Sequence, residues 1–421
     1  MEIIAGKSEL QVFNIPAKQL VVQDGAFVDY LPLTVLDQTT TSLDFLIQAS
    51  DVDYLDLNDS YLYVRFKVVQ GDGKDLDATS ECKPVNYLMC ALFSDVKLYL
   101  NDTLIEGGGG DTYPYKAVIE SIFNFNEDSK RIQLLSAGFS DDANERKKWI
   151  AQSRTCELVG ALRLNFFSQP KYILPNVKMR LELTMNKDAF SLIVPKADAA
   201  GNASIRMLAA RLYVRRVRVN DSVRIGHKDG LQLQNAIYPY VRAEVITSAI
   251  PQQSHYYTKD NLFGHSQMPK FVVLGLVKSA AYKGSYDSDP FMFNSFDVQS
   301  IGLYRDGESV PCRRIYEQKF DDNLFTDTYF RSILLNTQHY NSNQNNGIRM
   351  EDFRPDGGYT FYTFNLAPDF DMFQTQQISD GNLRLDIKFS KPNKEAINVI
   401  AYALYDDVVQ ITEEYKVIKQ Q

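Results

Sequence analysis

Four aspartates lie within nine residues near the start of the chain, at Asp51, Asp53, Asp56 and Asp59. Carboxylates at such spacing are ligands that Ca²⁺ prefers in proteins. An EF-hand loop would need a Gly at its sixth position and a Glu at its twelfth. Counted from Asp51, these positions hold Asp56 and Leu62. The run is therefore no EF-hand, and we expect a solvated turn ahead of a strand, with a looser ion site left open.

Two glycine-containing segments could cradle a phosphate, GDGK at 71–74 and EGGGGD at 106–111. Neither contains the G-x-x-x-x-G-K-[ST] pattern of a P-loop. The second segment precedes a predicted helix, whose N-terminus could attract an anion, but Glu106 and Asp111 would repel it. We expect a hairpin turn at the first segment and a surface loop at the second.

Histidines and cysteines are few and scattered. The histidines form no H-x-H pair of the kind that a cupin uses to bind a metal: His227, His255, His265 and His339. The cysteines form no CxxC pair and are expected to be free thiols in a reducing compartment: Cys82, Cys90, Cys156 and Cys312. No GxSxG motif occurs. The sequence therefore predicts no catalytic residue, no metal ligand and no cofactor, and it indicates a protein that is not an enzyme.

Composition limits the class of protein further. The 421 residues exceed what one hydrophobic core usually encloses, so two cores are expected. A net charge of −8 disfavours a nucleic-acid partner, and the basic stretch RLYVRRVRV at 211–219 is typical of a strand with one charged face. No apolar run approaches the roughly 18 residues of a membrane span, and the first residues lack the pattern of a secretion signal.

Alternation of apolar and polar residues predicts β-strands at 61–68, 177–183 and 382–389, each with one face in a core. The stretch FVVLGLV at 271–277 is apolar on both faces and is typical of a fully buried strand. With 25 Phe and 25 Tyr against one Trp, the composition also favours β-structure.

Two segments have helical periodicity instead. Residues 111–125 begin with Asp111 or Thr112 as a possible cap and Pro114 in the first turn, and they place one apolar stripe on a helix: Tyr115, Val118, Ile119, Ile122 and Phe123. Residues 326–336 could be capped by Asp327 and place a second apolar set on one face: Tyr329, Phe330, Ile333 and Leu334.

Short strand and helix sequences recur in the same order about 200 residues apart. The pairs are LYLND at 98 with LYRDG at 303, SIFN at 121 with SILLN at 332, NFFSQP near Phe166 with FNLAP near Phe364, and RLELT at 180 with RLDIK at 384. Earlier in each half, KPVNYLMCALFSDV corresponds to DPFMFNSFDV. The order of these landmarks indicates an internal duplication.

A module of about 200 residues with about eight strands and one short helix fits a two-sheet jelly roll. We therefore predict an all-β fold of two tandem jelly-roll sandwiches, with one short helix in each. The boundary is expected near 216–230, which gives a first jelly roll at 1–215, including an N-terminal arm at about 1–20, and a second at 216–421. Long polar segments follow both helices, at 125–149 and 337–359, so the duplication places them at the same end of the molecule.

The sequence resembles a known family, the double jelly-roll major capsid (hexon-like) proteins of Polinton (Maverick) elements and adintoviruses. The resemblance covers most of the chain and is most specific from Leu262 to Pro311. Further matching segments are DYLDLNDSYLYVRFKV, PVNYLMCALFSDVKLYLNDTLI, YPYKAVIESIFNF, NAIYPYVRAEV and GNLRLDIKFSKPNKEAINVIAYALYDD.

The resemblance implies a structural protein whose homotrimers form pseudo-hexameric capsomers that tile an icosahedral shell. It implies neighbouring capsomers and penton or minor capsid proteins as partners, and a virion protein made in the host cytoplasm or nucleus rather than secreted. It also implies that 125–149 and 337–359 project from the outer face, as tower loops do. Two alternatives stay open: a domesticated gene without virion assembly, and a cell-surface double jelly-roll module that binds glycan or protein.

Overall fold

The computed structural model describes residues 20–37, 40–196, 198, 201–311, 313–335, 346–371, 375, 377 and 379–420. The predicted N-terminal arm, apart from Leu20, lies outside the described residues, as do Cys312 and His339. No helix in the described ranges is long and apolar enough to cross a membrane.

The first half of the chain folds into two four-stranded antiparallel sheets. One sheet has the order β1 (Val22–Tyr30), β10 (Ser204–Val219), β3 (Asp53–Val69) and β7 (Cys156–Gly160). The other has the order β2 (Ser42–Ile47), β8 (Met179–Met185), β5 (Phe93–Leu100) and β6 (Thr103–Glu106). The short strands β4 (Lys83–Pro84) and β9 (Leu192–Ile193) form a separate pair.

The second half repeats this arrangement. One sheet has the order β11 (Ala236–Ile250), β19 (Ile397–Ile411), β13 (Phe271–Lys278) and β17 (Phe361–Asn365), with β20 (Val417–Gln420) paired to β19. The other has the order β12 (Tyr256–Lys259), β18 (Leu383–Phe389), β14 (Val298–Arg305) and β15 (Glu308–Val310), with β16 (Tyr316–Glu317) paired to β14.

The two halves have the same topology. When β4, β9, β16 and β20 are set aside, the described residues of each half form eight strands. Counting these along the chain gives sheet orders 1-8-3-6 and 2-7-4-5 in both halves. This is the strand order of a jelly roll, in which the last strand returns beside the first. The predicted fold of two tandem jelly rolls is confirmed.

The repeated strand sequences occupy equivalent positions. Tyr99 on β5 lies opposite Arg180 on β8, and Tyr304 on β14 lies opposite Arg384 on β18. Each arginine also stacks over its tyrosine ring, at 5.5 Å and 4.9 Å. NFFSQP and FNLAP correspond only approximately. Phe166 lies in the 3₁₀ helix η3 (Asn165–Ser168) after β7, the sixth strand of its half, whereas FNLAP lies in and after β17, the sixth strand of the other half.

Alternation predicted the strands well. The segments 61–68, 177–183 and 382–389 fall on β3, β8 and β18, and 271–277 falls on β13, where every residue from Phe271 to Val277 is buried. The apolar faces of these strands lie inside the sandwiches, where burial of each large side chain contributes about 1.5–3 kcal/mol.

The predicted helices form α2 (Tyr113–Asn124) and α8 (Thr326–Tyr329), which continues as the π-helix η4 (Phe330–Leu335). Each lies between the fifth and sixth strands of its half. Thr112 occupies the N-cap position of α2, but its side chain makes no capping hydrogen bond.

The structure contains more helix than the one per half that we predicted. The additional elements are α1 (Leu88–Ala91), α3 (Glu127–Ile132), η1 (Leu135–Ala137), α4 (Ala143–Ile150), η2 (Ala151–Ser153), η3, α5 (Asp188–Ser191), α6 (Asp221–Leu233) and α7 (Ser279–Tyr282). Segment 125–149, expected as a polar loop, largely folds into α3 and α4, because Asn126 and Asp142 cap these helices by accepting from the N–H groups of Ser129 and Asn144.

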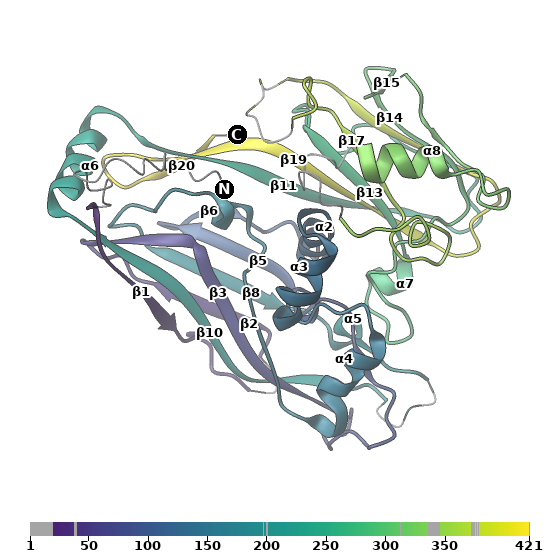
Figure 1. The fold of residues 1–421 in the computed structure, drawn as a ribbon, viewed down its shortest axis with the longest axis horizontal. Helices are drawn as coiled ribbons and strands as arrows, with labels where there is room; N and C mark the ends of the chain where they lie inside the picture. Colours follow the sequence, from purple (N-terminus) through teal and green to yellow (C-terminus); the bar gives the residue numbers. More distant parts are fainter. Residues whose placement is uncertain are drawn as a thin grey trace, which may run out of the picture.

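The two jelly rolls lie side by side, and α6 connects them at one end of the molecule (Figure 1). The helices α4, α7 and α8 lie toward the other end, while α2 lies between the two halves (Figure 1). Strand β10 ends at Val219, so α6 begins where the last strand of the first sandwich stops.

Candidate functional site

The acidic run and the basic stretch lie on neighbouring strands and neutralise each other. Strands β3 and β10 are paired, so the guanidinium of Arg215 donates to Asp56 at 2.7 Å and to Asp59 at 2.8 Å, and that of Arg218 donates to Asp53 at 3.2 Å. The arginines thus occupy carboxylate oxygens that a cation would need. Within the described ranges, no group of three or more His, Cys, Asp and Glu residues is arranged to hold a metal.

The glycine-rich segment is stabilised by protein groups rather than open to an anion. The Asp95 carboxylate accepts from the N–H of Gly108 at 3.1 Å. At the end of β6, Glu106 accepts from the N–H groups of Asn165 and Phe166 at 2.9 Å and 3.0 Å. A phosphate at this loop would therefore meet two carboxylates.

The described histidines contact separate partners. His227 Nδ1 lies 2.8 Å from the Tyr54 hydroxyl, and His265 Nε2 lies 3.1 Å from the Glu244 carboxylate. The first pair joins α6 to β3 and the second joins a loop to β11. These two histidines therefore form no common site.

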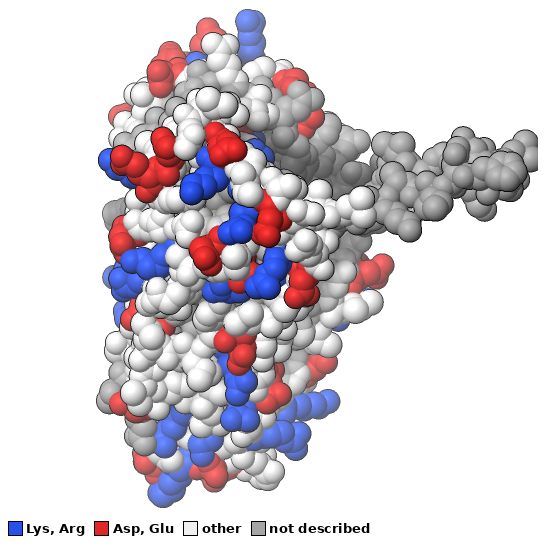
Figure 2. Space-filling model, turned by 90° about the vertical axis from the view of Figure 1, so that its left-hand side faces the viewer, with Lys and Arg blue, Asp and Glu red and all other residues white. Residues whose placement is uncertain are grey.

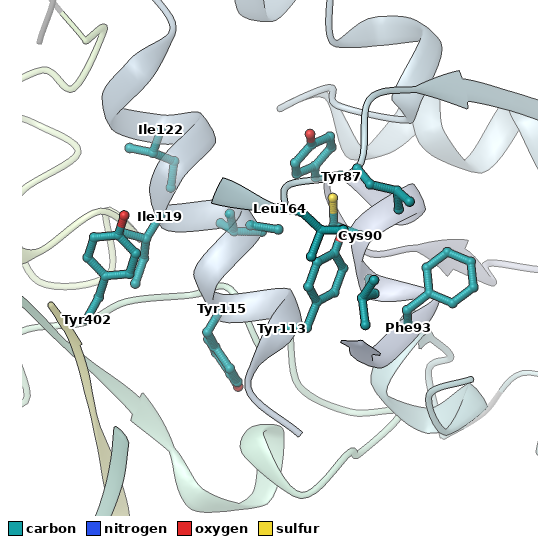
Figure 3. Close-up of a cluster of buried hydrophobic side chains, with 14 of the residues drawn as sticks. Tyr87, Cys90, Phe93, Tyr113, Tyr115, Ile119, Ile122, Leu164 and Tyr402 are labelled. Carbon is teal, nitrogen blue, oxygen red and sulfur yellow. The ribbon is translucent and has the colours of Figure 1, made fainter. Parts of the chain in front are cut away.

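An internal surface, the seam between the two jelly rolls, is centred on α2. Every residue of α2 from Tyr113 to Phe123 is buried, including Lys116 and Glu120. Periodicity predicted one apolar stripe, as on a surface helix, but α2 is covered by both halves. Figure 3 shows Tyr402 of β19 beside Ile119 of α2, with Tyr87 and Cys90 of the first half on the other side.

Charged residues on α2 are satisfied inside this seam. The Lys116 ammonium binds the Glu106 carboxylate, donates to the carbonyl of Arg163 at 2.7 Å and lies 3.8 Å from Glu120. The Tyr402 hydroxyl donates to Glu120 at 3.2 Å, which links the two halves. Burial raises the pKa of Glu120, although Lys116 opposes this shift.

Burial alone would lower the pKa of Lys116, but the Glu106 and Glu120 carboxylates outweigh it, and the net shift of the Lys116 pKa is upward. The lysine therefore stays charged in the seam. A buried cation with carboxylates on both sides is costly to disrupt, because removal of one partner leaves charges without compensation in a low dielectric.

Aromatic rings fill the rest of the seam. The Tyr115 ring stacks with Tyr282 at 5.7 Å and meets the edge of Phe293 at 6.2 Å. Farther along α2, Phe123 packs against Phe361 of β17 at 5.4 Å. Such pairs add about 0.5–1.5 kcal/mol each beyond the area they bury, so the two jelly rolls form one block.

The C-terminal segment, which includes Tyr415 and strand β20, joins the two halves at a second place. Strand β20 pairs with β19 of the second half, yet the Asn101 side chain of the first half donates to the carbonyl of Tyr415 at 2.7 Å. The Lys419 ammonium donates to the carbonyl of Ile105, at the end of β6, at 3.0 Å.

The segments that follow the two equivalent helices meet each other, as the duplication predicts for their described parts. The Lys130 ammonium donates to the carbonyl of Asn346 at 2.5 Å, Arg349 lies 3.1 Å from Glu127, and the Tyr359 hydroxyl donates to Asp141 at 2.8 Å. A cleft of about 450 Å³ lies here, and its lining includes Glu127, Lys130, Asp141, Arg349 and Tyr359. Burial there lowers the pKa of Lys130 to about 8.

Two outer surfaces carry large exposed apolar side chains. On the β1-β10-β3-β7 sheet, Phe27, Tyr61 and Tyr213 form an aromatic ladder, with the two tyrosine rings stacked at 4.8 Å and Phe27 51% exposed. On the helix α8–η4, Phe330 is 51% and Leu334 38% exposed. Exposed apolar patches of this kind mark interaction surfaces.

The sequence did not distinguish this second surface from a core. We predicted that Phe330 and Leu334 share one apolar face of a helix with Ile333, but Ile333 is buried whereas Phe330 and Leu334 are exposed. The segment is a π-helix, whose i→i+5 hydrogen bonds rotate successive side chains differently from an α-helix, so the predicted spacing no longer applies.

Comparison with known proteins shows the fold. No family model matches the chain. The uncharacterized protein F54H12.2 of Caenorhabditis elegans is 23% identical over 393 residues, which are 87% of this chain and 90% of that protein. A chain of the cryo-EM structure of the Sputnik virophage is 11% identical with a TM-score of 0.64, covering 100% of this chain and 93% of that one.

Two solved major capsid proteins are also similar to this chain, with somewhat lower TM-scores. The mavirus major capsid protein is 10% identical with a TM-score of 0.57, covering 100% of this chain and 94% of that one. The Faustovirus major capsid protein is 10% identical with a TM-score of 0.57, covering 95% of this chain and 92% of that one. The chain thus has the double jelly-roll fold of these capsid proteins along its whole length.

Proposed function

We propose that this chain is a structural major capsid protein whose homotrimers form pseudo-hexameric capsomers of an icosahedral shell. The observation that carries the proposal is the repeated eight-strand order, with both jelly rolls fixed in one block by α2. Three copies of a block with two similar units present six similar wedges around one axis. The full-length likeness to solved major capsid proteins supports the same function.

The proposed domains are a first jelly roll at residues 1–215 and a second at 216–421. The end of β10 and the helix α6 form the connection between them. We assign the protein to the Polinton or adintovirus type on the sequence resemblance that is strongest from Leu262 to Pro311. Its proposed location is the virion capsid, after synthesis in the host cytoplasm or nucleus, and neighbouring capsomers and penton or minor capsid proteins are its proposed partners.

The proposed orientation places the α3–α4 segment and residues 346–359 on the outer face of the shell. Their mutual contacts, including the Lys130 hydrogen bond to Asn346, are compatible with a joint tower. Limited trypsin digestion of the native assembly tests this orientation: cleavage first at 125–149 would support it, and protection of that segment in the assembly with cleavage in the monomer would overturn it.

Native mass measured by light scattering, together with negative-stain images of the same peak, tests the function. The monomer mass is 48.0 kDa, so a trimer has about three times that mass. Trimers with a pseudo-hexagonal outline, or closed shells, would support the proposal. A stable monomer that binds glycans would favour the cell-surface binding module instead.

A further inference from the structure

Two buried cations of the first jelly roll lack a carboxylate partner. Arg146 on α4 is only 6% exposed, and Lys130 on α3 is 8% exposed. The Arg146 guanidinium donates to the carbonyl of Pro84 at 2.6 Å, and the Lys130 ammonium donates to the carbonyl of Asn346 at 2.5 Å. Within the described part of the chain neither cation forms an ion pair, although Lys and Arg are almost never fully buried unless they are paired.

Arg146 also has a polar atom without a partner. Its Nε is buried, and no hydrogen-bond acceptor among the described residues reaches it. A buried donor that is left unsatisfied is costly, and the cost is larger on a charged group. Burial also lowers the pKa of Arg146 and lowers the pKa of Lys130 to about 8, a change that a nearby anion would oppose.

Other cations of this protein lie beside carboxylates. Figure 2 shows Lys and Arg interleaved with Asp and Glu over the end of the molecule that carries α6, and Arg215 lies 2.7 Å from Asp56. The segment that precedes Asn346, residues 336–345, lies outside the described ranges and contains no Asp or Glu. That segment therefore offers no carboxylate to Arg146 or Lys130.

Both unpaired cations line the cleft of about 450 Å³. Its walls come from the α3–α4 segment of the first half and from residues 347–359 of the second half, and α4 lies at the end of the molecule opposite α6 (Figure 1). Pockets of this volume hold small organic molecules. An anion bound in the cleft would be a counter-ion for Arg146 and Lys130 together.

Four carboxylates in the same lining restrict the kind of anion that fits. Each already accepts from the protein: Glu127 from Arg131 and Arg349, Asp141 from Asn86 and Tyr359, Asp289 from Phe291, and Asp352 from Arg349. They would repel a doubly charged phosphate more strongly than a singly charged carboxylate. Their remaining lone pairs can accept from hydroxyl groups, because an ionised carboxylate has about four acceptor sites.

Aromatic side chains complete the lining that a ligand would meet: Tyr87, Phe139, Phe291 and Tyr359. Ligand sites usually combine apolar and aromatic walls with a few polar groups that fix orientation. A ligand that fits this cleft therefore has one negative charge, hydroxyl donors and an apolar ring face.

We propose that the cleft binds a sugar acid, a sugar ring that carries one carboxylate and several hydroxyl groups. The ligand carboxylate accepts from Arg146 Nε and from Lys130, whose ammonium has two donors left after its bond to Asn346. The hydroxyls donate to the lining carboxylates, and the C–H groups of the ring pack on the aromatic side chains. This site goes beyond the proposed capsid function and does not depend on trimer formation.

The test measures binding to the full chain by isothermal titration calorimetry. The sugar acids are D-glucuronate and N-acetylneuraminate, and the comparison compounds are glucose, acetate and inorganic phosphate. The cleft variants are Arg146→Gln and Lys130→Gln. The matched control is Lys148→Gln, which removes the same charge from an exposed position on α4 outside the cleft. Circular dichroism melting of each ligand-free variant checks its fold, and either folded cleft variant is sufficient for the comparison.

We expect at least one of the sugar acids to bind the unmodified chain and the Lys148→Gln control equally well. Its affinity for each folded cleft variant should fall at least about tenfold, because truncation of one partner of a buried charge pair is costly. Glucose should not bind, and acetate and phosphate should bind at least about tenfold more weakly than the sugar acid.

Three results would overturn the proposal. The first is that neither sugar acid binds the unmodified chain. The second is unchanged affinity in a folded Arg146→Gln or Lys130→Gln protein, which would place the ligand elsewhere. The third is binding of acetate or phosphate as tight as that of the sugar acid, which would show a simple anion site without selectivity for a sugar.

Discussion

Replacing Lys116 by methionine tests whether α2 is enclosed between the two jelly rolls. Lys116, Glu106 and Glu120 side chains are 9%, 7% and 8% exposed, and the substitution would leave two carboxylates in the seam without their cation. Removal of one partner from a buried ion pair costs about 3–5 kcal/mol. With a urea dependence of roughly 3 kcal/mol per molar, the unfolding midpoint should fall by about 1–2 M.

The assay is urea unfolding followed by circular dichroism, with Lys391→Met as the matched control. Lys391 pairs with Asp321 at 2.9 Å on the surface, so its loss should leave the midpoint unchanged. Adding Glu106→Gln to Lys116→Met should recover part of the lost stability, because one uncompensated charge is then removed. A Lys116→Met protein that unfolds at the original midpoint would refute the enclosed seam.

The loss of stability caused by Lys116→Met should also depend on pH. Burial raises the pKa of Glu120 in the folded state, and Lys116 opposes that rise. A raised carboxyl pKa contributes stability below the ordinary Glu pKa, and that stability is lost as pH rises through the folded-state pKa. Without Lys116 the Glu120 pKa rises further, so the deficit of Lys116→Met should be larger at about pH 8 than at about pH 5.

Three further predictions concern the core, the thiols and the acidic turn. Phe123→Ala should lower the free energy of unfolding by about 3–5 kcal/mol, because it opens a cavity against Phe361. The same urea assay measures this loss, and a loss under about 1 kcal/mol would contradict the packing of Phe123. Burial raises the pKa of Cys82 to about 12 and that of Cys90 to about 11, so both thiols should be unreactive in the native protein at neutral pH. Peptide mass spectrometry should find both cysteines unlabelled by iodoacetamide before denaturation and labelled after it. Rapid labelling of the native protein would contradict their burial. Adding Ca²⁺ or a chelator should leave the melting temperature unchanged, because Arg215 holds the carboxylates of the acidic turn, and a rise with Ca²⁺ would reveal an ion site there.

Local pattern was sufficient for several of the strands of this fold. Alternation located β3, β8 and β18, and a continuous apolar run located β13, because strand periodicity depends only on which face is buried. The duplication followed from the order of short sequences, and register places Tyr99 and Tyr304 in equivalent positions.

Features that depend on packing between distant parts of the chain could not be predicted from the sequence. Nothing in the local sequence of α2 reveals that Lys116 and Glu120 are buried, because their partners Glu106 and Tyr402 come from other parts of the chain. The exposure of Phe330 depended on a π-helix that apolar spacing does not encode. The sequence does contain one long-range signal, an acidic run and an arginine run of complementary charge, which pair with each other as Asp56 and Arg215 do.

The measurement that tests the central claim most directly is the native mass of the purified chain by light scattering. The capsid account predicts a single species of about three times 48.0 kDa, with a pseudo-hexagonal outline in negative stain. A folded protein that remains at 48.0 kDa at every concentration tested would contradict it.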